Sequence, residues 1–155
     1  MKVREVMRSE PSVCTPDAHL ARVGRLMAEA DCGFLPVIGD EDRVVGVITD
    51  RDVALAAATR DRRPSEIQVR QVISGEVYSC GPDDDIRDAL TVMRERQVRR
   101  LPVVDSHGLR GILSLDDVVL EAQAVATESF TGPFYADVAL TLKAINLHRT
   151  PVPVA

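Results

Sequence analysis

The sequence predicts an α/β chain of two consecutive β-α-β-β-α repeats, followed by a helical tail. Two observations lead to this prediction. The first 125 residues align with themselves as two similar halves. In each half, apolar residues at helical spacing precede two short apolar strands and an acidic helix start. Because a regular internal repeat indicates one structural unit used more than once, both halves are expected to fold alike.

The repeat can be followed along the chain. Pro36 aligns with Pro102 at an offset of 66 residues, and Gly46 aligns with Gly111 after a one-residue deletion. The predicted divisions are a first domain at 1–60, a linker at 61–68, a second domain at 69–125 and a C-terminal extension at 126–155. A unit of about 60 residues is only marginally stable alone, so we expect the repeats to pack together about a pseudo-twofold axis.

Each repeat is expected to begin with a short lead-in segment, an extended stretch and a helix. The lead-in segments are Val3–Met7 and Val69–Ile73. Pro16-Asp17 and Pro82-Asp83 are predicted to open the helices, because acidic residues in a first turn interact favourably with the helix dipole. The apolar stripe of the first helix is Leu20, Val23, Met27 and Ala30, which indicates one buried face.

Two strands and a second helix complete each repeat. The strands are predicted at Phe34–Ile38, Arg43–Thr49, Leu101–Asp105 and Leu109–Ser114. The second helices start at Asp50 and at Leu115. A further helix is predicted near residues 136–147 of the extension. Its weak apolar stripe of Ala136, Ala139, Leu140, Lys143 and Leu147 is expected to pack on the repeats or on a second subunit.

Composition excludes several classes of function. Aromatic residues make up 3% of the chain and the formal net charge is −5, so neither the stacking platforms nor the basic surface of nucleic-acid-binding proteins is expected. No apolar stretch approaches the roughly 20 residues that span a bilayer. The first residues lack the apolar core of a signal peptide. We therefore expect a cytoplasmic protein that binds neither nucleic acid nor membrane.

No constellation of catalytic or metal-binding residues is evident. The sequence has no P-loop, no Gly-x-Ser-x-Gly and no His-Glu-x-x-His motif, so we do not expect an enzyme. The three histidines and three cysteines lack ligand spacing, so no metal site is expected. Cys14 and Cys80 occupy equivalent positions and are interpreted as small apolar strand residues.

The residues that close each strand pair resemble those of a CBS domain. Leu-Pro-Val is followed by Gly-hydrophobic-hydrophobic-Thr/Ser-x-x-Asp, which lies within Gly46–Val53 and Gly111–Val118. Two such units in tandem resemble a Bateman module, and the likeness covers about residues 1–125. The resemblance implies a non-catalytic regulatory protein that needs no cofactor. It implies binding of AMP, ADP, ATP or S-adenosylmethionine between the repeats, formation of a homodimer and an unidentified regulated partner. It also places Val13, Thr15 and Pro36 at the base pocket.

Thr49 and Asp52 are candidate ligand-binding residues at the start of the second helix. Free backbone amides and the helix dipole favour an anion there, and the Thr49 hydroxyl adds a hydrogen-bond donor. Asp52 is expected to accept hydrogen bonds from ribose hydroxyls. The same spacing is typical of a capping box, and the two roles can coexist. Ser114 and Asp117 form the equivalent pair in the second repeat.

The two pairs differ in their neighbouring charges. Arg51 lies within the Thr49 motif and favours a phosphate, whereas Asp116 lies within the Ser114 motif and repels one. If the repeats pack about a pseudo-twofold axis, Arg99 or Arg100 reaches a phosphate held near Thr49. The alternative for these two arginines and Arg96 is a solvated surface run.

Two hypotheses of different class follow from these residues. In the first, the protein is a nucleotide sensor that binds at Thr49–Asp52, with weak or absent binding at Ser114–Asp117. In the second, it is a scaffold or dimerisation protein with degenerate clefts. Arg51 and Arg99-Arg100 favour the sensor, while Asp116 and the uncharged Gly33-Phe34, which stand in the first repeat where the second has Arg99-Arg100, favour the scaffold.

Overall fold

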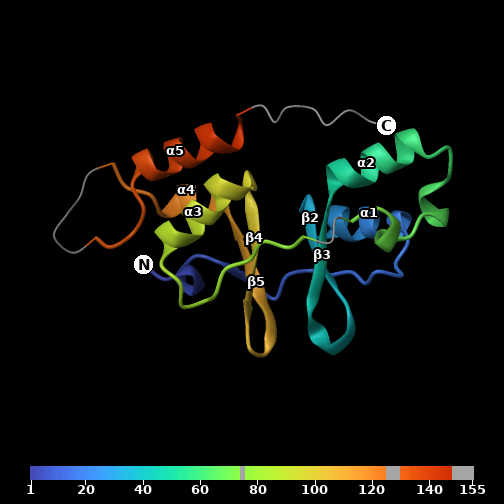
Figure 1. The fold of residues 1–155 in the computed structure, drawn as a ribbon, viewed down its shortest axis with the longest axis horizontal. Helices are drawn as coiled ribbons and strands as arrows, with labels where there is room; N and C mark the ends of the chain where they lie inside the picture. The colour runs from blue at the N-terminus through green and yellow to red at the C-terminus, as the bar shows by residue number, and fades with distance from the viewer. Residues whose placement is uncertain (74–75, 125–129, 148–155) are drawn as a thin grey trace.

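The computed structural model describes residues 1–73, 76–124 and 130–147, and two antiparallel hairpins lie side by side at its centre (Figure 1). The first hairpin pairs β2 (Phe34–Ile38) with β3 (Val44–Thr49), and the second pairs β4 (Arg100–Asp105) with β5 (Gly108–Ser114). Helices α1 (Leu20–Glu29) and α2 (Asp50–Thr59) flank the first hairpin. Helices α3 (Ile86–Arg96), α4 (Leu115–Glu121) and α5 (Tyr135–Ile145) flank the second. The predicted α/β fold of two repeats and a helical tail is confirmed.

Each repeat has its own aliphatic core. In the first, the fully buried side chains include Leu20, Val23, Leu35 and Ile48. In the second they include Ile86, Leu90, Met93, Leu101 and Leu113. The buried helix positions recur every three or four residues, so one face of each helix packs inward. In β3 alternate positions are buried, whereas β2 and β4 each have a run of consecutive buried residues and are therefore covered on both faces.

Each lead-in segment packs into the core of the other repeat. Val3 belongs to the second core, where its amide donates to the carbonyl oxygen of Asp84 at 3.0 Å. Val69 belongs to the first core, where its amide donates to the carbonyl oxygen of Ala18 at 2.9 Å. The short strand β1 (Arg8–Ser9) follows the first lead-in segment and pairs with β5 of the second repeat. The two repeats therefore exchange their lead-in segments, so each hydrophobic core is completed by the lead-in segment of the other repeat.

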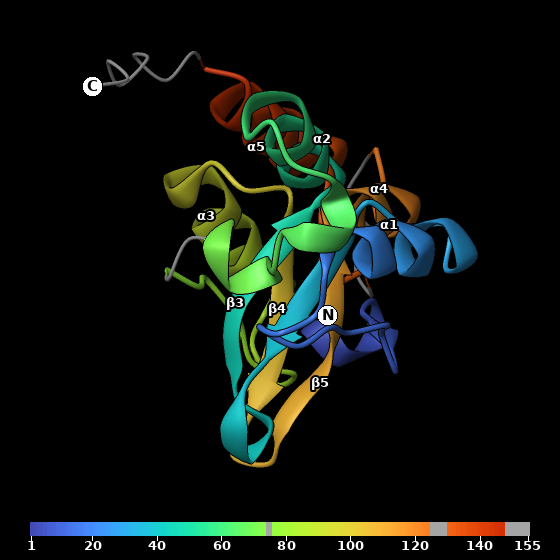
Figure 2. The ribbon, with the colours of Figure 1, turned by 90° about the vertical axis from the view of Figure 1, so that its right-hand side faces the viewer.

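The exchange is symmetric, as a pseudo-twofold arrangement requires. Arg4 of the first lead-in segment forms an ion pair with Asp83, and its repeat equivalent Arg70 forms one with Asp17. Seen after a quarter turn, both hairpins point in the same direction, with their tips away from the helices (Figure 2). Hairpins that point the same way are what a pseudo-twofold axis along the hairpin direction produces.

The first helix of each repeat begins later than predicted. Helix α1 starts at Leu20 rather than at Pro16-Asp17, and α3 starts at Ile86 rather than at Pro82-Asp83. The carbonyl oxygens of Pro16 and Pro82 accept hydrogen bonds from the lead-in segment of the opposite repeat, each at 2.9 Å. Because these carbonyls bond across the repeats, the proline segments form turns and the helices begin after them.

The tail helix forms as predicted, but it buries a different face. Helix α5 packs on α3 and α4 through Val138 and Thr141, whereas the predicted stripe residues Ala136, Ala139, Leu140, Lys143 and Leu147 are exposed. The Thr141 hydroxyl donates to the Asp137 carbonyl oxygen at 2.7 Å and accepts from Arg94 at 3.1 Å. These bonds allow a polar residue to be fully buried, which an apolar periodicity does not reveal.

Among the helices of the described residues, none combines the length and the hydropathy that crossing a membrane requires.

Candidate functional site

Thr49 ends β3 and is the N-cap of α2. Its hydroxyl accepts a hydrogen bond from the Asp52 amide at 3.2 Å and donates to Asp52 Oδ2 at 2.6 Å. The Thr49 amide also donates to Asp52 Oδ2, at 2.9 Å. Thr49 and Asp52 therefore form a capping box, which was one of the two roles that the sequence allowed for this pair. Within the described residues Asp52 Oδ1 accepts no hydrogen bond, so this carboxylate retains a free acceptor.

An open cleft of about 710 Å³, here called the Thr49 cleft, lies between the two repeats. The first repeat contributes Thr49 and Arg51, and the second contributes Arg99 and Arg100. Phe34, Val47, Tyr78 and Pro102 form an apolar and aromatic part of its wall. The pseudo-twofold packing thus brings the second-repeat arginines to the helix start of the first repeat, as the sequence predicted.

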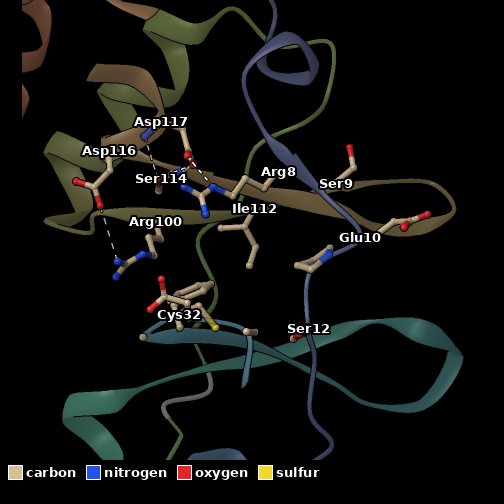
Figure 3. A pocket seen from close by; sticks show the side chains of 15 residues that line it. Arg8, Ser9, Glu10, Ser12, Cys32, Arg100, Ile112, Ser114, Asp116 and Asp117 are labelled. Atoms are coloured by element: carbon tan, nitrogen blue, oxygen red, sulfur yellow. Dashed lines mark hydrogen bonds and ion pairs between the residues drawn. The ribbon is translucent and has the colours of Figure 1, made fainter. Parts of the chain in front are cut away.

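A second cleft of about 360 Å³, the Ser114 cleft, lies in the equivalent place (Figure 3). Ser114 caps α4 as Thr49 caps α2, and its hydroxyl and amide both donate to Asp117 Oδ2. The other oxygen of Asp117 already has a partner, since Arg8 Nε donates to Oδ1 at 2.8 Å. This hydrogen bond is the main reason that the pKa of the Arg8 guanidinium is raised. Both oxygens of Asp117 are therefore occupied by the protein itself.

Comparison with known proteins assigns this architecture. The model of the CBS domain matches residues 3–59 and 69–123. The chain belongs to the CBS domain family. It is 29% identical over 137 residues to Hypoxic response protein 1 of Mycobacterium tuberculosis, covering 88% of this chain and 96% of that protein.

Solved structures agree with this family. The crystal structure of Hypoxic Response Protein I with two coordinated zinc ions is 30% identical, with a TM-score of 0.71 and coverage of 77% of this chain and 98% of that chain. The CBS domain pair of protein MJ0100, in complex with 5′-methylthioadenosine and S-adenosyl-L-methionine, has a TM-score of 0.69 at 19% identity, covering 78% of this chain and 94% of that chain. The second likeness shows the fold alone. The chain is a CBS-pair regulatory module, and no catalytic domain is evident in its described residues.

The two CBS clefts differ in charge as the sequence predicted. Among described residues the Thr49 cleft is lined by three arginines and two carboxylates, namely Arg51, Arg99, Arg100, Asp50 and Glu76. The Ser114 cleft is lined by two arginines and four carboxylates, namely Arg8, Arg100, Glu10, Asp31, Asp116 and Asp117. An anion is therefore favoured in the first cleft and opposed in the second.

Around the start of β4, Arg96 and Arg99 are exposed and Arg100 is half-buried, and all three have partners within the protein. Arg96 lies over the Tyr78 ring at 4.9 Å, and Arg99 donates to Asn146 Oδ1 at 2.9 Å. Arg100 lies 3.9 Å from Asp116 and lines both clefts. The hydrogen bond of Tyr78 with Glu76 raises the pKa of that tyrosine. These contacts all lie within the second repeat and the tail helix, and of the three arginines Arg99 and Arg100 line the Thr49 cleft.

Apart from Ser114 and Asp117, which line the other cleft, four predicted site residues lie away from the lining of the Thr49 cleft. Val13 is exposed, Thr15 lines a separate depression beside Arg70, and Pro36 is buried within β2. Asp52 is half-buried behind Thr49. Pro36 lies in the other repeat, and its repeat equivalent Pro102 lines the cleft instead. Tyr78, which also lines the cleft, aligns with Ser12, whereas Ser79, the equivalent of Val13, lines a separate depression.

The cysteines behave as core residues. Cys14 and Cys80 are buried, and burial raises the pKa of their thiols to about 11 and about 12 respectively. Cys32 is half-buried at the Ser114 cleft. Within the described residues, no three His, Cys, Asp or Glu side chains lie close enough together to hold a metal ion.

Proposed function

We propose that this CBS pair is a sensor that binds an adenosine-containing nucleotide, such as AMP, ADP or ATP, in the Thr49 cleft. The observation that carries the proposal is the convergence of Arg51 and Arg99 from opposite repeats on the N-terminus of α2. Hydrogen bonds between a guanidinium and a phosphate are charge-assisted, and they add to the anion preference of the helix start. A bound nucleotide would therefore join the two repeats.

The remaining walls of the cleft fit the rest of a nucleotide. Tyr78 offers a base the ring face that Arg96 does not cover, and Phe34, Val47 and Pro102 offer apolar surface. The free Oδ1 of Asp52 is an acceptor for a ribose hydroxyl once the side chain turns toward the cleft. S-adenosylmethionine shares the adenosine part, and the CBS domain pair of protein MJ0100 is seen with this ligand and 5′-methylthioadenosine.

Regulation requires a partner protein that binds the nucleotide-bound and nucleotide-free states of the module differently. Leu55 on α2 is 51% exposed and Leu120 on α4 is 79% exposed, so equivalent helices of both repeats present apolar side chains to solvent. We propose that these faces form a homodimer, as the resemblance to CBS pairs implies, and that an unidentified regulated protein contacts the assembly. Sedimentation of the purified protein tests the dimer, and a monomer with both leucines exposed would contradict it.

Calorimetric titration with AMP, ADP, ATP and S-adenosylmethionine tests the sensor. Ligand at 100 times its dissociation constant adds about 2.7 kcal/mol to stability, which for this size of domain raises Tm by roughly 5–10 °C. No heat and no Tm shift with any of the four ligands would refute the proposal.

Matched variants test which cleft binds. Asp52→Asn is expected to weaken binding strongly, because it removes the carboxylate behind Thr49. Asp117→Asn changes the equivalent residue of the other cleft and should leave affinity nearly unchanged. Equal losses of affinity in the two variants would contradict the preference for the Thr49 cleft.

The scaffold hypothesis retains one supporting observation. The Arg8–Asp117 ion pair occupies the Ser114 cleft, so that cleft already serves the fold. If no ligand binds and the protein is dimeric, the scaffold is the better account of the whole chain.

A further inference from the structure

Helix α5 lies outside the CBS repeats but reaches the Thr49 cleft. Both matched CBS segments end before it begins, since the second ends at residue 123 and α5 starts at Tyr135. The Ile145 side chain at its C-terminal end lines the cleft together with Thr49 and Arg51. The tail therefore contributes a wall to a cleft whose other walls come from the repeats.

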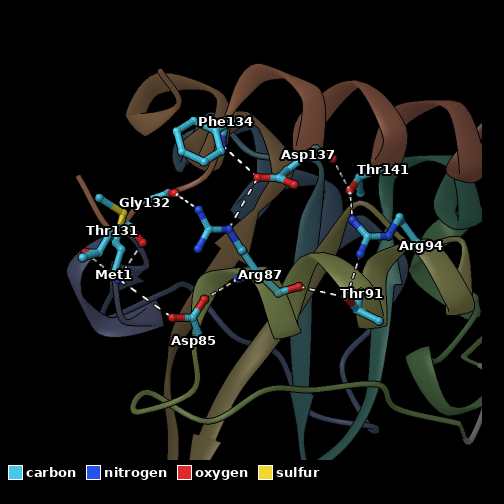
Figure 4. A network of polar contacts seen from close by, with 10 residues as sticks. All are labelled: Met1, Asp85, Arg87, Thr91, Arg94, Thr131, Gly132, Phe134, Asp137 and Thr141. Carbon is cyan, nitrogen blue, oxygen red and sulfur yellow. Dashed lines mark hydrogen bonds and ion pairs between the residues drawn. The ribbon is translucent and has the colours of Figure 1, made fainter. Parts of the chain in front are cut away.

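The body of α5 is fastened to the second repeat (Figure 4). Arg87 of α3 donates to the Gly132 carbonyl oxygen at 2.7 Å, lies 3.6 Å from Asp137 and stacks 5.3 Å from the Phe134 ring centroid. About two turns further along α3, Arg94 donates to the buried Thr141 hydroxyl at 3.1 Å. These contacts set the position of α5 along α3, and so the position of its C-terminal end.

The C-terminal end of α5 is tied to the segment that carries the cleft arginines. Gln97 Nε2 donates to the carbonyl oxygens of Ala144 and Leu147 at 3.2 and 3.3 Å. Arg99 donates to Asn146 Oδ1 at 2.9 Å, and in this held position Arg99 lines the cleft. The Arg99 side chain is exposed, and this hydrogen bond holds its guanidinium beside the C-terminal end of α5.

We propose that α5 completes the nucleotide site, with Asn146 as the residue that positions Arg99 for the phosphate. The inference rests on the proposed function of the Thr49 cleft. Ordering a flexible side chain before the ligand arrives removes that cost from binding. By linkage, a nucleotide that binds better when α5 is docked also holds α5 in place. Occupancy of the cleft is thereby coupled to the order of the tail.

Affinity measurements test the positioning role. Asn146→Ala is expected to weaken ATP binding about two- to tenfold, the range that follows from releasing one long side chain. Leu140→Ala is the matched control, since Leu140 lies on the same helix, is 59% exposed and does not line the cleft. The decisive measurement is the double variant with Arg99→Ala. If Asn146 acts through Arg99, the Asn146→Ala change has no further effect on affinity once Arg99 is absent.

Hydrogen exchange tests the coupling. ATP is expected to slow amide exchange over residues 142–147 in the wild type and to lose this effect in Asn146→Ala. Without nucleotide, Arg99→Ala should already speed exchange there, because the hydrogen bond to Asn146 is lost. Faster exchange on adding ATP, or unchanged affinity in Asn146→Ala, would overturn the inference and leave the sensor intact. If no nucleotide binds the wild type, the proposed function and the inference both fall.

Discussion

Removing the cap hydroxyls of α2 and α4 should destabilise the protein unequally, although the two caps have the same bonds. Ser114→Ala removes an N-cap, which costs about 1 kcal/mol. It also takes one donor from the Asp117 carboxylate, whose side chain is 9% exposed, and a buried acceptor left short of a partner costs about 1 kcal/mol more. Thr49→Ala loses the cap alone, because water reaches the half-buried Asp52 carboxylate. We expect losses of about 2 and about 1 kcal/mol respectively.

Urea unfolding of the two variants measures this difference. Their m-values should match the wild type, so that the midpoints report stability alone. In thermal unfolding the losses correspond to Tm shifts of roughly 4–8 °C for Ser114→Ala and 2–4 °C for Thr49→Ala. Nucleotide affinity should show the opposite ranking, with Thr49→Ala the more harmful. Equal stability losses would refute the assignment of Ser114 to the fold, and an equal loss of affinity would refute the assignment of Thr49 to the ligand.

Three further predictions follow from burial and close packing. In the native protein Cys32 should react with a thiol reagent well before Cys14 and Cys80, whose burial keeps them protonated; comparable rates for all three by mass spectrometry would contradict this. Folding raises the pKa of these two thiols above the ordinary 9.0. The free energy of unfolding should therefore be constant below about pH 9 and fall as the pH rises toward 11 and 12. Urea titrations that show no loss of stability at alkaline pH would contradict this prediction. Gly111→Ala should cost more stability than the repeat-equivalent Gly46→Ala. The added methyl group at Gly111 would lie 2.6 Å from a backbone carbonyl oxygen of β1, whereas at Gly46 it would lie 2.7 Å from the flexible end of an isoleucine side chain. The reverse ranking of the urea midpoints would show that the backbone of β1 shifts at little cost.

The order of elements was predictable because each is encoded locally. The apolar spacing predicted the first helix of each repeat, and the strand Phe34–Ile38 was predicted with the same first and last residues that the structure shows. The contrast between the clefts was also predictable, since it depends on which charges flank Thr49 and Ser114 in the chain. These features need no knowledge of how the repeats meet.

The features that the sequence did not reveal all depend on long-range packing. Two repeats of similar sequence offer similar surfaces, so nothing local shows that Val3 packs in the second core rather than the first. The same ambiguity assigned Pro36 to the cleft in place of its second-repeat equivalent, Pro102. Arg8 meets Asp117 across 109 residues of chain, and no spacing rule predicts such a pair.

The exchange of lead-in segments has a consequence for the history of the chain. Each cleft takes one wall from each repeat, so a single repeat has no complete cleft. An ancestor of one repeat could form clefts only by pairing with an identical copy, and symmetry would then make both clefts the same. Fusion of two copies into one chain removes that symmetry. After fusion, Asp116 and the Arg8–Asp117 pair could fill one cleft with structural contacts while Arg51 and Arg99 kept the other suited to an anion.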